Sequence, residues 1–361
     1  MKKKHFLWLL FLYVTASIYL AATTPITPHE AKHFYAPGVV SFLMHAGTSV
    51  IPGFLGLRIL FLATAFLSIR IFYALSQRYF SKREDVYFST VLFMFLPGIL
   101  TASALANIGI IVLALVLLFV LLYERDQYSV LPLVMLALFF IHEASIIFFI
   151  ALLLYGLVHK EKMLSILSAA FIFAFVYLAK GIEVGGRPSG HFIEIFGLYA
   201  AVFSPFLFLY FFYTMYRILL RGKRTLMWYI SFTALAVSLL LSIRQKIYIT
   251  DFAPYVMIST IAMVDVFMQS LRVRLPLFRR TYLRGMYVVI LFMILSIVTL
   301  LANKMLFHLT KEGKKHIAHR IYQPYYLAKE LRSKGIRCYD AKGRSSLQLR
   351  YYGIPSCSST E

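Results

Sequence analysis

The sequence has few charged residues, and few of those are acids. Only 14% of its 361 residues are charged, and 15 acids face 37 lysines and arginines, whereas a soluble domain carries roughly 25% charged residues. The sequence also lacks a GxxxxGK[ST] loop and a CxxC pair. Soluble nucleotide chemistry and a thiolate zinc site therefore have no support in it.

Most of the sequence consists of apolar residues. The chain is 60% hydrophobic and 17% aromatic, with a mean hydropathy of +0.76, and several apolar runs reach the roughly 17–25 residues that a membrane-spanning helix needs. The net charge of +22 does not indicate a nucleic acid partner, because lysine and arginine lie mostly in short connectors between apolar runs. The positive-inside rule expects that pattern. The sequence therefore predicts an all-α polytopic membrane protein.

Eleven segments are predicted to span the membrane. They are residues 6–22, 55–75, 86–103, 107–123, 129–141, 144–158, 163–180, 192–220, 227–243, 252–268 and 283–302. The first segment could also be a signal peptide, although ten further spans favour an uncleaved helix, and both alternatives leave Thr23 outside. The fifth and sixth segments are short and could instead form one long helix, which would reverse all later segments.

The distribution of charge favours eleven spans. With eleven spans, eighteen lysines and arginines lie inside and five outside, whereas ten spans would split the basic clusters at 217–224 and 272–284 across the membrane. We therefore expect the N-terminus inside and the C-terminus outside. Residues 1–302 would form a transmembrane helical domain and residues 303–361 a short extracytoplasmic tail.

The tail holds both cysteines of the chain, Cys338 and Cys357. An outside tail lies in an oxidising compartment, where a disulfide persists. We predict that the two cysteines pair, and the alternative is two unpaired thiols.

Ionisable and polar residues collect at the predicted outer ends of the spans. Charged groups cost roughly 2.5–3.5 kcal/mol each in lipid on insertion scales, so they mark sites that use them. The candidate site residues are His29, Glu30, Arg58, Asn107, His142, Glu143, Arg187, Arg244, Lys246 and Tyr248. Carboxylates together with cations suit a phosphorylated lipid and a proton acceptor, because cations hold the phosphate and a carboxylate takes a proton from an attacking hydroxyl.

Each candidate also has a purely structural interpretation. Glu30 could pair with Lys32 in a solvated loop, and Arg58 could extend to the lipid headgroups. His142 and Glu143 could simply make a tight turn polar. Arg244 and Lys246 could be interfacial anchors, and the glycine-rich loop at 185–190 could be flexible rather than a lid over a substrate.

Several short motifs occur in a characteristic order. Residues 28–31 with Tyr35 match an acidic first-loop motif in which His29 stands where aspartate is usual, residues 53–58 end in Arg58 at the entry to the second span, and residues 242–255 match a late outer loop. Together they resemble the GT-C superfamily of membrane glycosyltransferases, in the branch that holds protein O-mannosyltransferases and lipid A aminoarabinose transferases.

Two further features bear on this resemblance. Asn107 stands where many members of the branch have aspartate. Residues 347–353 resemble a short strand-and-tyrosine element of their outer domains, so the resemblance predicts an α/β-like tail, although this tail is far shorter than most of those domains.

The resemblance implies a mechanism. An acceptor hydroxyl would attack a sugar carried on a polyprenyl phosphate in the outer leaflet of the cytoplasmic (inner) membrane, where the resemblance places the protein, with inversion at the anomeric carbon. Glu30, beside His29, would deprotonate or orient the hydroxyl, while Arg58, Arg244 and Lys246 would stabilise the leaving polyprenyl phosphate. The other candidate residues would bind substrate. No metal is required, although His29 with Glu30 could bind a divalent ion.

Two other function classes stay open. A transporter or flippase of a lipid-linked sugar also needs polar groups in a helical bundle, but transporters place them near the midplane and often show two related halves, which this sequence does not. A non-enzymatic scaffold for an envelope assembly would tolerate Glu30→Gln without effect. Neither the sugar nor the acceptor can be read from the sequence.

Overall fold

The computed structural model describes residues 2–178, 190–309, 318–341 and 343–357. The chain divides into two compact units. The larger unit comprises residues 1–13, 64–100 and 108–297, and the smaller unit comprises residues 14–63, 101–107 and 298–361. The smaller unit therefore combines the tail with segments from the N-terminal third of the chain. The domain boundary at 302/303 stays a prediction.

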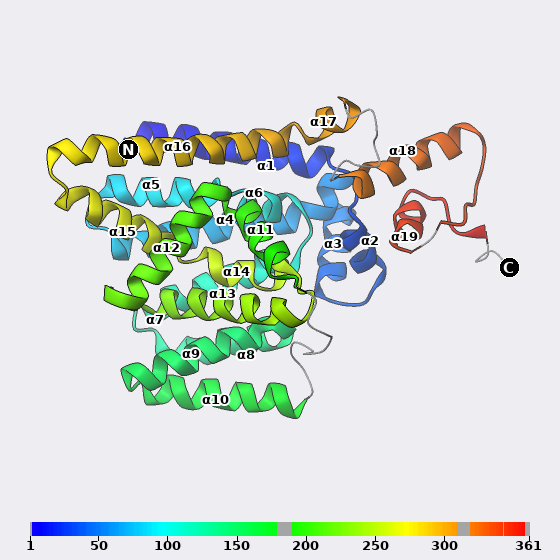
Figure 1. Cartoon of the computed structure of the whole chain (residues 1–361). Helices are drawn as coiled ribbons and strands as arrows, with labels where there is room; N and C mark the ends of the chain where they lie inside the picture. The colour runs from blue at the N-terminus through cyan, green and yellow to red at the C-terminus, as the bar shows by residue number, and fades with distance from the viewer. Residues whose placement is uncertain (1, 179–189, 310–317, 342, 358–361) are drawn as a thin grey trace. The chain divides into compact units, whose positions relative to one another are not determined.

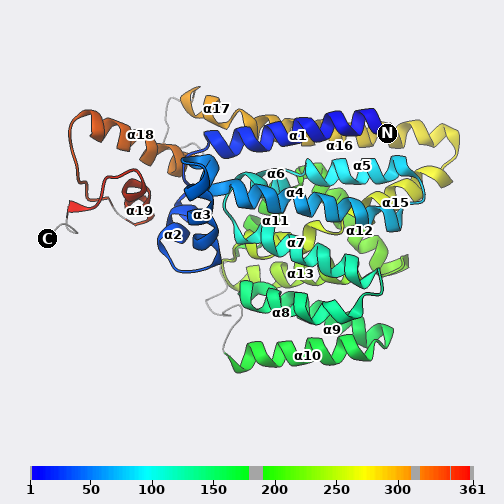
Figure 2. The same cartoon turned by 180° about the vertical axis from the view of Figure 1, so that it is seen from behind.

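The helices of the larger unit are α5 (Arg83–Met94), α7 (Ile108–Tyr123), α8 (Leu131–Ile141), α9 (Ile146–His159), α10 (Lys162–Tyr177), α11 (Phe192–Phe203), α12 (Pro205–Arg221), α13 (Leu226–Arg244), α14 (Ala253–Met257) and α15 (Thr260–Val273). Three short 3-10 turns join them: η1 (Tyr128–Val130), η2 (Glu143–Ser145) and η3 (Ile249–Asp251). Figures 1 and 2 show α10, α9 and α13 side by side, with α9 in the middle.

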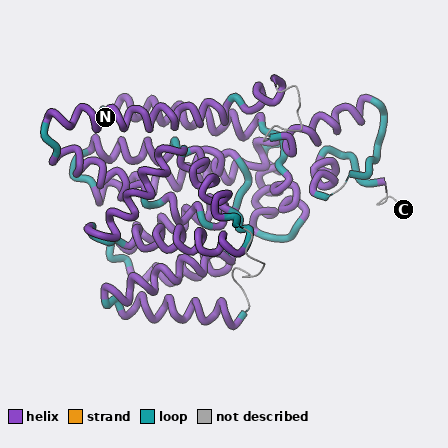
Figure 3. The backbone as a smooth tube through the Cα atoms, viewed as in Figure 1, coloured by secondary structure: helices purple, strands orange, loops and turns teal. Residues whose placement is uncertain are grey.

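The helices of the smaller unit are α2 (Pro28–Tyr35), α3 (Val39–Val50), α17 (Asn303–Leu309), α18 (His319–Ser333) and α19 (Arg344–Tyr351). Four more helices have residues in both units: α1 (Lys3–Thr23), α4 (Phe54–Tyr79), α6 (Pro97–Ala104) and α16 (Pro276–Leu301). Among the described residues no strand occurs, and Figure 3 shows helices and loops only.

Every predicted span falls on a helix or on a pair of consecutive helices. Five helices are long and apolar enough to cross a membrane, and the number rises to seven if each of two bent pairs is one span. The bent pairs are α5 with α6, at 60°, and α11 with α12, at 105°. The helices α7 to α10 are apolar but shorter than 18 residues. The chain is a multi-pass membrane protein, while the count of eleven spans and the sidedness of the termini stay predictions.

The surface of α16 supports a lipid environment. Val288, Leu291, Leu295 and Val298 are each about half exposed or more, with exposed fractions of 48–62%. Their spacing of three or four residues puts them on one face of the helix. A contiguous apolar face of this kind is rare on soluble monomers, so we assign it to lipid contact.

The fifth and sixth predicted spans are separate helices. His142 has an extended backbone between α8 and α9, with φ −147° and ψ 126°. The rings of Phe139 and Phe149 both contact those of Phe171 and Phe175 on α10, although a straight helix would place them about 15 Å apart. The chain therefore turns at His142, as the hairpin interpretation predicts.

The segment between the first two predicted spans contains α2 and α3, which are too short to be spans. One sequence expectation needs correction. Residues 347–353 were expected to form a strand, but residues 344–351 form α19, so the described part of the tail is helical rather than α/β-like. Alternation of apolar and polar residues in so short a segment does not separate a strand from two helical turns.

Candidate functional site

Helix α2 begins with a capping box that turns Glu30 into the protein. The Thr27 hydroxyl accepts a hydrogen bond from the Glu30 backbone N–H at 3.2 Å, and the Glu30 carboxylate accepts one from the Thr27 backbone N–H at 2.9 Å. Pro28 follows at the first helical position, where its missing N–H costs nothing. The sequence Thr-Pro-x-Glu thus fixes both the start of α2 and the direction of its acid.

The carboxylate of Glu30 meets the guanidinium of Arg58 at two points. Arg58 Nε donates to Glu30 Oε1 at 2.8 Å, and Arg58 Nη2 donates to Glu30 Oε2 at 2.7 Å. The side chains are 1% and 0% exposed respectively. Two parallel bonds of this kind match the fork of arginine to a carboxylate.

The remaining N–H groups of Arg58 bind backbone carbonyls. Nη1 donates to the carbonyls of Ala21 at 2.9 Å and Thr24 at 2.7 Å, and Nη2 donates to that of Pro25 at 3.1 Å. The last carbonyls of a helix lack partners within it. Arg58 supplies partners at the end of α1 and uses all five of its N–H groups in doing so.

Glu30 also accepts a hydrogen bond from the backbone N–H of Ala106 at 2.8 Å. Burial alone would raise the pKa of Glu30, but the Arg58 charge and the hydrogen bonds from Arg58, Thr27 and Ala106 lower it below its ordinary value. Glu30 is therefore ionised and enclosed. Its assignment as the proton acceptor stays a prediction, and this geometry favours a structural role.

The tail holds the chain segment just ahead of α2. The Tyr352 hydroxyl accepts a hydrogen bond from the Ile26 backbone N–H at 3.2 Å, and Gln348 Nε2 donates to the Ile26 carbonyl at 2.8 Å. Gln348 lies within α19 and Tyr352 directly follows it, and α19 packs against α2. Ile26 is fully buried, so these bonds satisfy a backbone that has no access to water.

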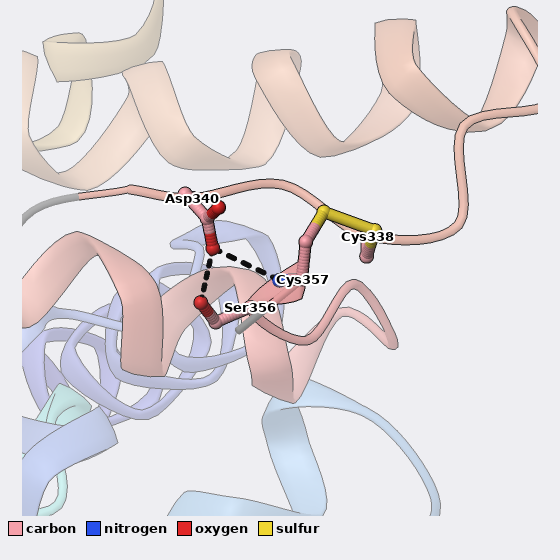
Figure 4. Close-up of a disulfide and its surroundings, with 4 residues drawn as sticks. All are labelled: Cys338, Asp340, Ser356 and Cys357. Atoms are coloured by element: carbon pink, nitrogen blue, oxygen red, sulfur yellow. Dashed lines mark hydrogen bonds between the residues drawn. A yellow bond between two sulfur atoms is a disulfide. The ribbon is translucent and has the colours of Figure 1, made fainter. Parts of the chain in front are cut away.

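A disulfide closes the tail. Cys338 and Cys357 are paired, with a Cα–Cα distance of 4.9 Å, and this confirms the prediction. Figure 4 shows Asp340 beside the bridge, where its carboxylate accepts hydrogen bonds from the Ser356 hydroxyl and from the Cys357 backbone N–H.

The sequence analysis missed one motif: residues 29–33 read His-Glu-Ala-Lys-His, the HExxH pattern in which two histidines of one helix bind zinc. The rings of His29 and His33 do lie together, with centroids 4.5 Å apart. Loss of water around the ring and the charges of His33 and Arg344 lower the pKa of His29 to about 4, so it is neutral. However, Glu30 is bound to Arg58, and the described residues contain no group of three metal-binding side chains. The donor set for the ion considered at His29 and Glu30 is therefore incomplete.

A second pair of titratable groups lies in the larger unit. His142 caps η2, since its Nδ1 accepts a hydrogen bond from the Ala144 backbone N–H at 3.0 Å. Its Nε2 faces Asp251 Oδ1 at 3.6 Å, and no hydrogen bond is made to this buried nitrogen. Burial lowers the pKa of His142 to about 4. For Asp251, burial and the nearby charge of Glu143 outweigh the Thr250 hydrogen bond and raise the pKa to about 6.

Two solved structures share this fold over nearly the whole chain. The crystal structure of ArnT from Cupriavidus metallidurans in the apo state matches 96% of this chain and 74% of its own, with a TM-score of 0.56 and 14% identity. The crystal structure of ArnT from the same organism bound to undecaprenyl phosphate matches 98% of this chain and 75% of its own, with a TM-score of 0.55 and 12% identity. The chain has the fold of ArnT.

This likeness confirms, at the level of the fold, the resemblance to the GT-C branch that holds aminoarabinose transferases. It goes beyond what sequence comparison detects. No family model matches the sequence, and no curated protein matches it.

The predicted site residues fall into two groups within this ArnT-like fold. The smaller unit brings together His29, Glu30 and Arg58, and places the half-buried Asn107 next to Ala106, whose N–H binds Glu30. The larger unit holds the other described candidates, which are His142, Glu143, Arg244, Lys246 and Tyr248. Arg187 lies outside the described residues.

The candidates of the larger unit differ in exposure. Glu143, Arg244, Lys246 and Tyr248 are exposed. Lys246 Nζ lies 3.1 Å from Glu194 Oε1, and the opposite oxygen of Glu194 lies 3.1 Å from His191 Nδ1. Exposed ion pairs are weak, so a stronger anion can compete for Lys246.

Asp251 and Glu194 were missed by the sequence analysis. Asp251 ends the polar loop that was singled out for Arg244, Lys246 and Tyr248, so the loop itself was a signal for it. Glu194 lies inside a predicted span, where a single acid among apolar residues is already a functional marker.

A groove of about 420 Å³ opens elsewhere in the larger unit. Its lining comes from α12, α15, α16 and the connector before α16, and includes Tyr210, Phe267, Arg274 and Tyr282. Its lining includes none of the candidate residues that the structure describes. We therefore do not place the reaction there.

Proposed function

We propose that the chain is a membrane glycosyltransferase that moves a sugar from a polyprenyl-phosphate donor to an acceptor hydroxyl at the outer face of the cytoplasmic membrane. The observation that carries this proposal is the ArnT fold over 96–98% of the chain. One of those ArnT structures holds undecaprenyl phosphate, the kind of lipid that such a reaction releases.

The exposed cations of the larger unit suit the donor phosphate. Lys246 and Arg244 are exposed and lie two residues apart at the end of α13. Arg58 is a weaker candidate, because all its N–H groups are engaged and its side chain is 0% exposed. We therefore assign the phosphate to Lys246 and Arg244, and give Arg58 and Glu30 the role of a frame that holds the ends of α1 and α2.

The proposal is tested first in cells. Cell-envelope lipids, glycans and glycoproteins from a deletion strain are compared by mass spectrometry with those from the same strain carrying the wild-type gene. A transferase predicts that one glycoform disappears in the deletion and returns on complementation. An unchanged set of glycoforms contradicts the proposal.

Transport of a lipid-linked sugar is the second candidate function, because two of the predicted spans are each broken into two helices. The breaks lie at Phe95–Leu96 between α5 and α6 and at Ser204 between α11 and α12, and transporters build their sites from such discontinuous helices.

Purified protein in detergent separates the two functions. The probe is the polyprenyl-phosphate-sugar fraction extracted from the deletion strain, mixed with envelope extract as acceptor. A transferase converts the donor without any membrane. A transporter leaves the donor intact under these conditions.

A further inference from the structure

Among the residues that the structure describes, three acids other than Asp251 lie near the predicted outer ends of the spans, and each is either paired or exposed. Glu30 is enclosed by Arg58 and two backbone N–H groups. Glu194 is paired with Lys246 and His191. Glu143 is exposed at the tip of the hairpin. A proton acceptor needs a carboxylate that is reachable and that has no strong cation partner.

Asp251 meets both conditions. Its side chain is 32% exposed, and its described partners are the Thr250 hydroxyl, at 3.3 Å, and His142. Neither partner is a lysine or an arginine. The pKa of about 6 that burial gives this carboxyl is also closer to neutral pH than that of an ordinary aspartate, which improves a general base.

The tautomer of His142 is fixed by its own backbone contact. Nδ1 accepts a hydrogen bond from the Ala144 N–H, so the proton of the neutral ring resides on Nε2. That Nε2–H is buried, has no hydrogen-bond partner, and faces Asp251 Oδ1 at 3.6 Å. A metal ion at Nε2 would require the proton on Nδ1, where the Ala144 N–H already points, so the pair is not a metal site.

A separation of 3.6 Å is slightly too long for a hydrogen bond. His142 Nε2–H is therefore a donor without a hydrogen bond, and it points at a carboxyl group that can still accept a proton. A small approach of the η3 turn toward η2 would complete the bond and fix the carboxylate in place.

We propose that Asp251 is the proton acceptor of the sugar transfer and that His142 positions its carboxylate. This rests on the proposed function. The acceptor O–H attacks the anomeric carbon, a new C–O bond forms, and the bond from that carbon to the phosphate oxygen breaks. The polyprenyl phosphate leaves with the electron pair, and the hydroxyl proton moves to Asp251. Asp251 is the catalytic residue here and His142 a positioning residue.

Other titratable groups lie on the elements that pack against η3 or face Asp251. They are Glu143 on η2, Glu194 and Tyr199 on α11, and Tyr255 on α14. Only Glu143 among them raises the pKa of Asp251. The fall of the transfer rate at low pH is therefore attributed to Asp251 only if replacing Asp251 also changes transfer, and not from its pKa alone.

The test compares three variants with wild type in the complemented deletion strain, with the glycoform normalised to protein in the membrane. Asp251→Asn should lower transfer by roughly 10²–10⁴-fold, the range for loss of a general base, at an unchanged protein level. Asp126→Asn is the matched control, since Asp126 is an exposed aspartate outside the proposed site, and it should match wild type.

His142→Asn separates positioning from capping. Asparagine is a good helix-capping residue and can still accept from the Ala144 N–H, but its side chain is too short to place a donor at the position of Nε2, which faces Asp251. In membranes assayed from pH 5 to 8, wild-type transfer should fall as pH drops below about 6. In His142→Asn the fall should begin at higher pH, because the Nε2–H that could donate to the ionised carboxylate when η3 approaches η2 is gone.

Each outcome decides the proposal. If the wild-type gene restores a glycoform and Asp251→Asn restores it within about threefold, the assignment of Asp251 is wrong while the transferase stands. If no glycoform depends on the gene, both proposals fall. If Asp251→Asn does not accumulate, the pH profiles decide, and profiles of His142→Asn and wild type that coincide overturn the positioning role and with it the proposal.

Discussion

Arg58 and Glu30 satisfy one another inside the smaller unit, through two hydrogen bonds of 2.8 and 2.7 Å between side chains that are 0% and 1% exposed. A buried ion pair contributes little net stability when intact, but removing one partner leaves a charge without compensation. Replacing one partner should therefore reduce the stability of the protein far more than replacing both, which tests whether the pair has a structural role.

Replacing Arg58 should destabilise the protein strongly. In Arg58→Met the Glu30 carboxylate stays buried without a cation, and three backbone carbonyls lose their donors, so we expect a loss of about 3–5 kcal/mol in the free energy of unfolding. Thermal unfolding of the purified protein in detergent measures this loss. Arg78→Met, an exposed position of the same helix α4, is the control and should leave the unfolding temperature unchanged.

Glu30→Gln separates the two roles of the acid. A structural role predicts less folded protein and a lower unfolding temperature, and the double variant Glu30→Gln, Arg58→Met should be more stable than the sum of the two single losses. A catalytic base predicts normal abundance and no transfer. Protein levels in membranes together with the unfolding temperatures distinguish these results, and a fully stable, inactive Glu30→Gln would restore Glu30 as the base.

The stability of the protein should depend on pH through His142 and Asp251 with opposite signs. The pKa of His142 is about 4 in the fold against 6.5 for the free group, so its contribution to stability increases as pH rises from 4 to 6.5. The pKa of Asp251 is about 6 against 3.8, so its contribution decreases as pH rises from 3.8 to 6. Between pH 4 and 6 the two largely cancel.

Replacing His142 should make the pH dependence that Asp251 contributes to stability measurable. In His142→Asn the free energy of unfolding, relative to wild type, should fall as pH rises from 4 to 6, by up to about 1.4 kcal/mol per pH unit. Unfolding curves at pH 4, 5 and 6 measure it. Equal differences at all three pH values would contradict the linkage.

Loss of the disulfide should loosen the tail. Cys338 and Cys357 are 19 residues apart, and closing a loop of that size stabilises a fold by about 3 kcal/mol in the chain-entropy model. Cys338→Ser with Cys357→Ser should make the tail more sensitive to limited proteolysis, while fragments from α7 to α10 keep their protection. Cleavage rates of the tail identical to wild type would argue against a stabilising role.

Tyr352→Phe tests the link between tail and α2. The variant leaves the buried Ile26 N–H without a partner, which should cost about 1–3 kcal/mol. Tyr351→Phe on the adjacent residue is the matched control and should cost less, as the Tyr351 hydroxyl has no role in this link. Thermal unfolding of the two variants side by side measures the difference, and equal losses would contradict the assignment.

The helices themselves were predictable, because apolar runs of sufficient length determine them. What composition does not contain is the bend between α11 and α12, where Ser204 adopts φ 80° ahead of Pro205. Helix α2 is eight residues long and polar, so no hydropathy window finds it. Its Thr27-x-x-Glu30 capping box was the available signal.

The pairing of the candidate residues was less predictable. Glu30 and Arg58 lie 28 residues apart, and only the fold shows that they form an ion pair with each other instead of facing a substrate. Asp251 lies 109 positions after His142 along the chain, and nothing in either loop indicates that they meet. Sequence patterns locate polar residues, but the partners of each residue decide its chemistry.

The bonds from Tyr352 and Gln348 to Ile26 join residues 326 and 322 positions apart, and this separation has a consequence for biosynthesis. At roughly 5–20 residues per second, about 20–60 seconds pass between synthesis of Ile26 and synthesis of its partners. During that interval the segment ahead of α2 is already synthesised, but the N–H and carbonyl of Ile26 do not yet have their side-chain partners. The growing chain must keep this segment hydrated or covered until Gln348 and Tyr352 emerge, so this part of the smaller unit can mature only after α19 has been synthesised.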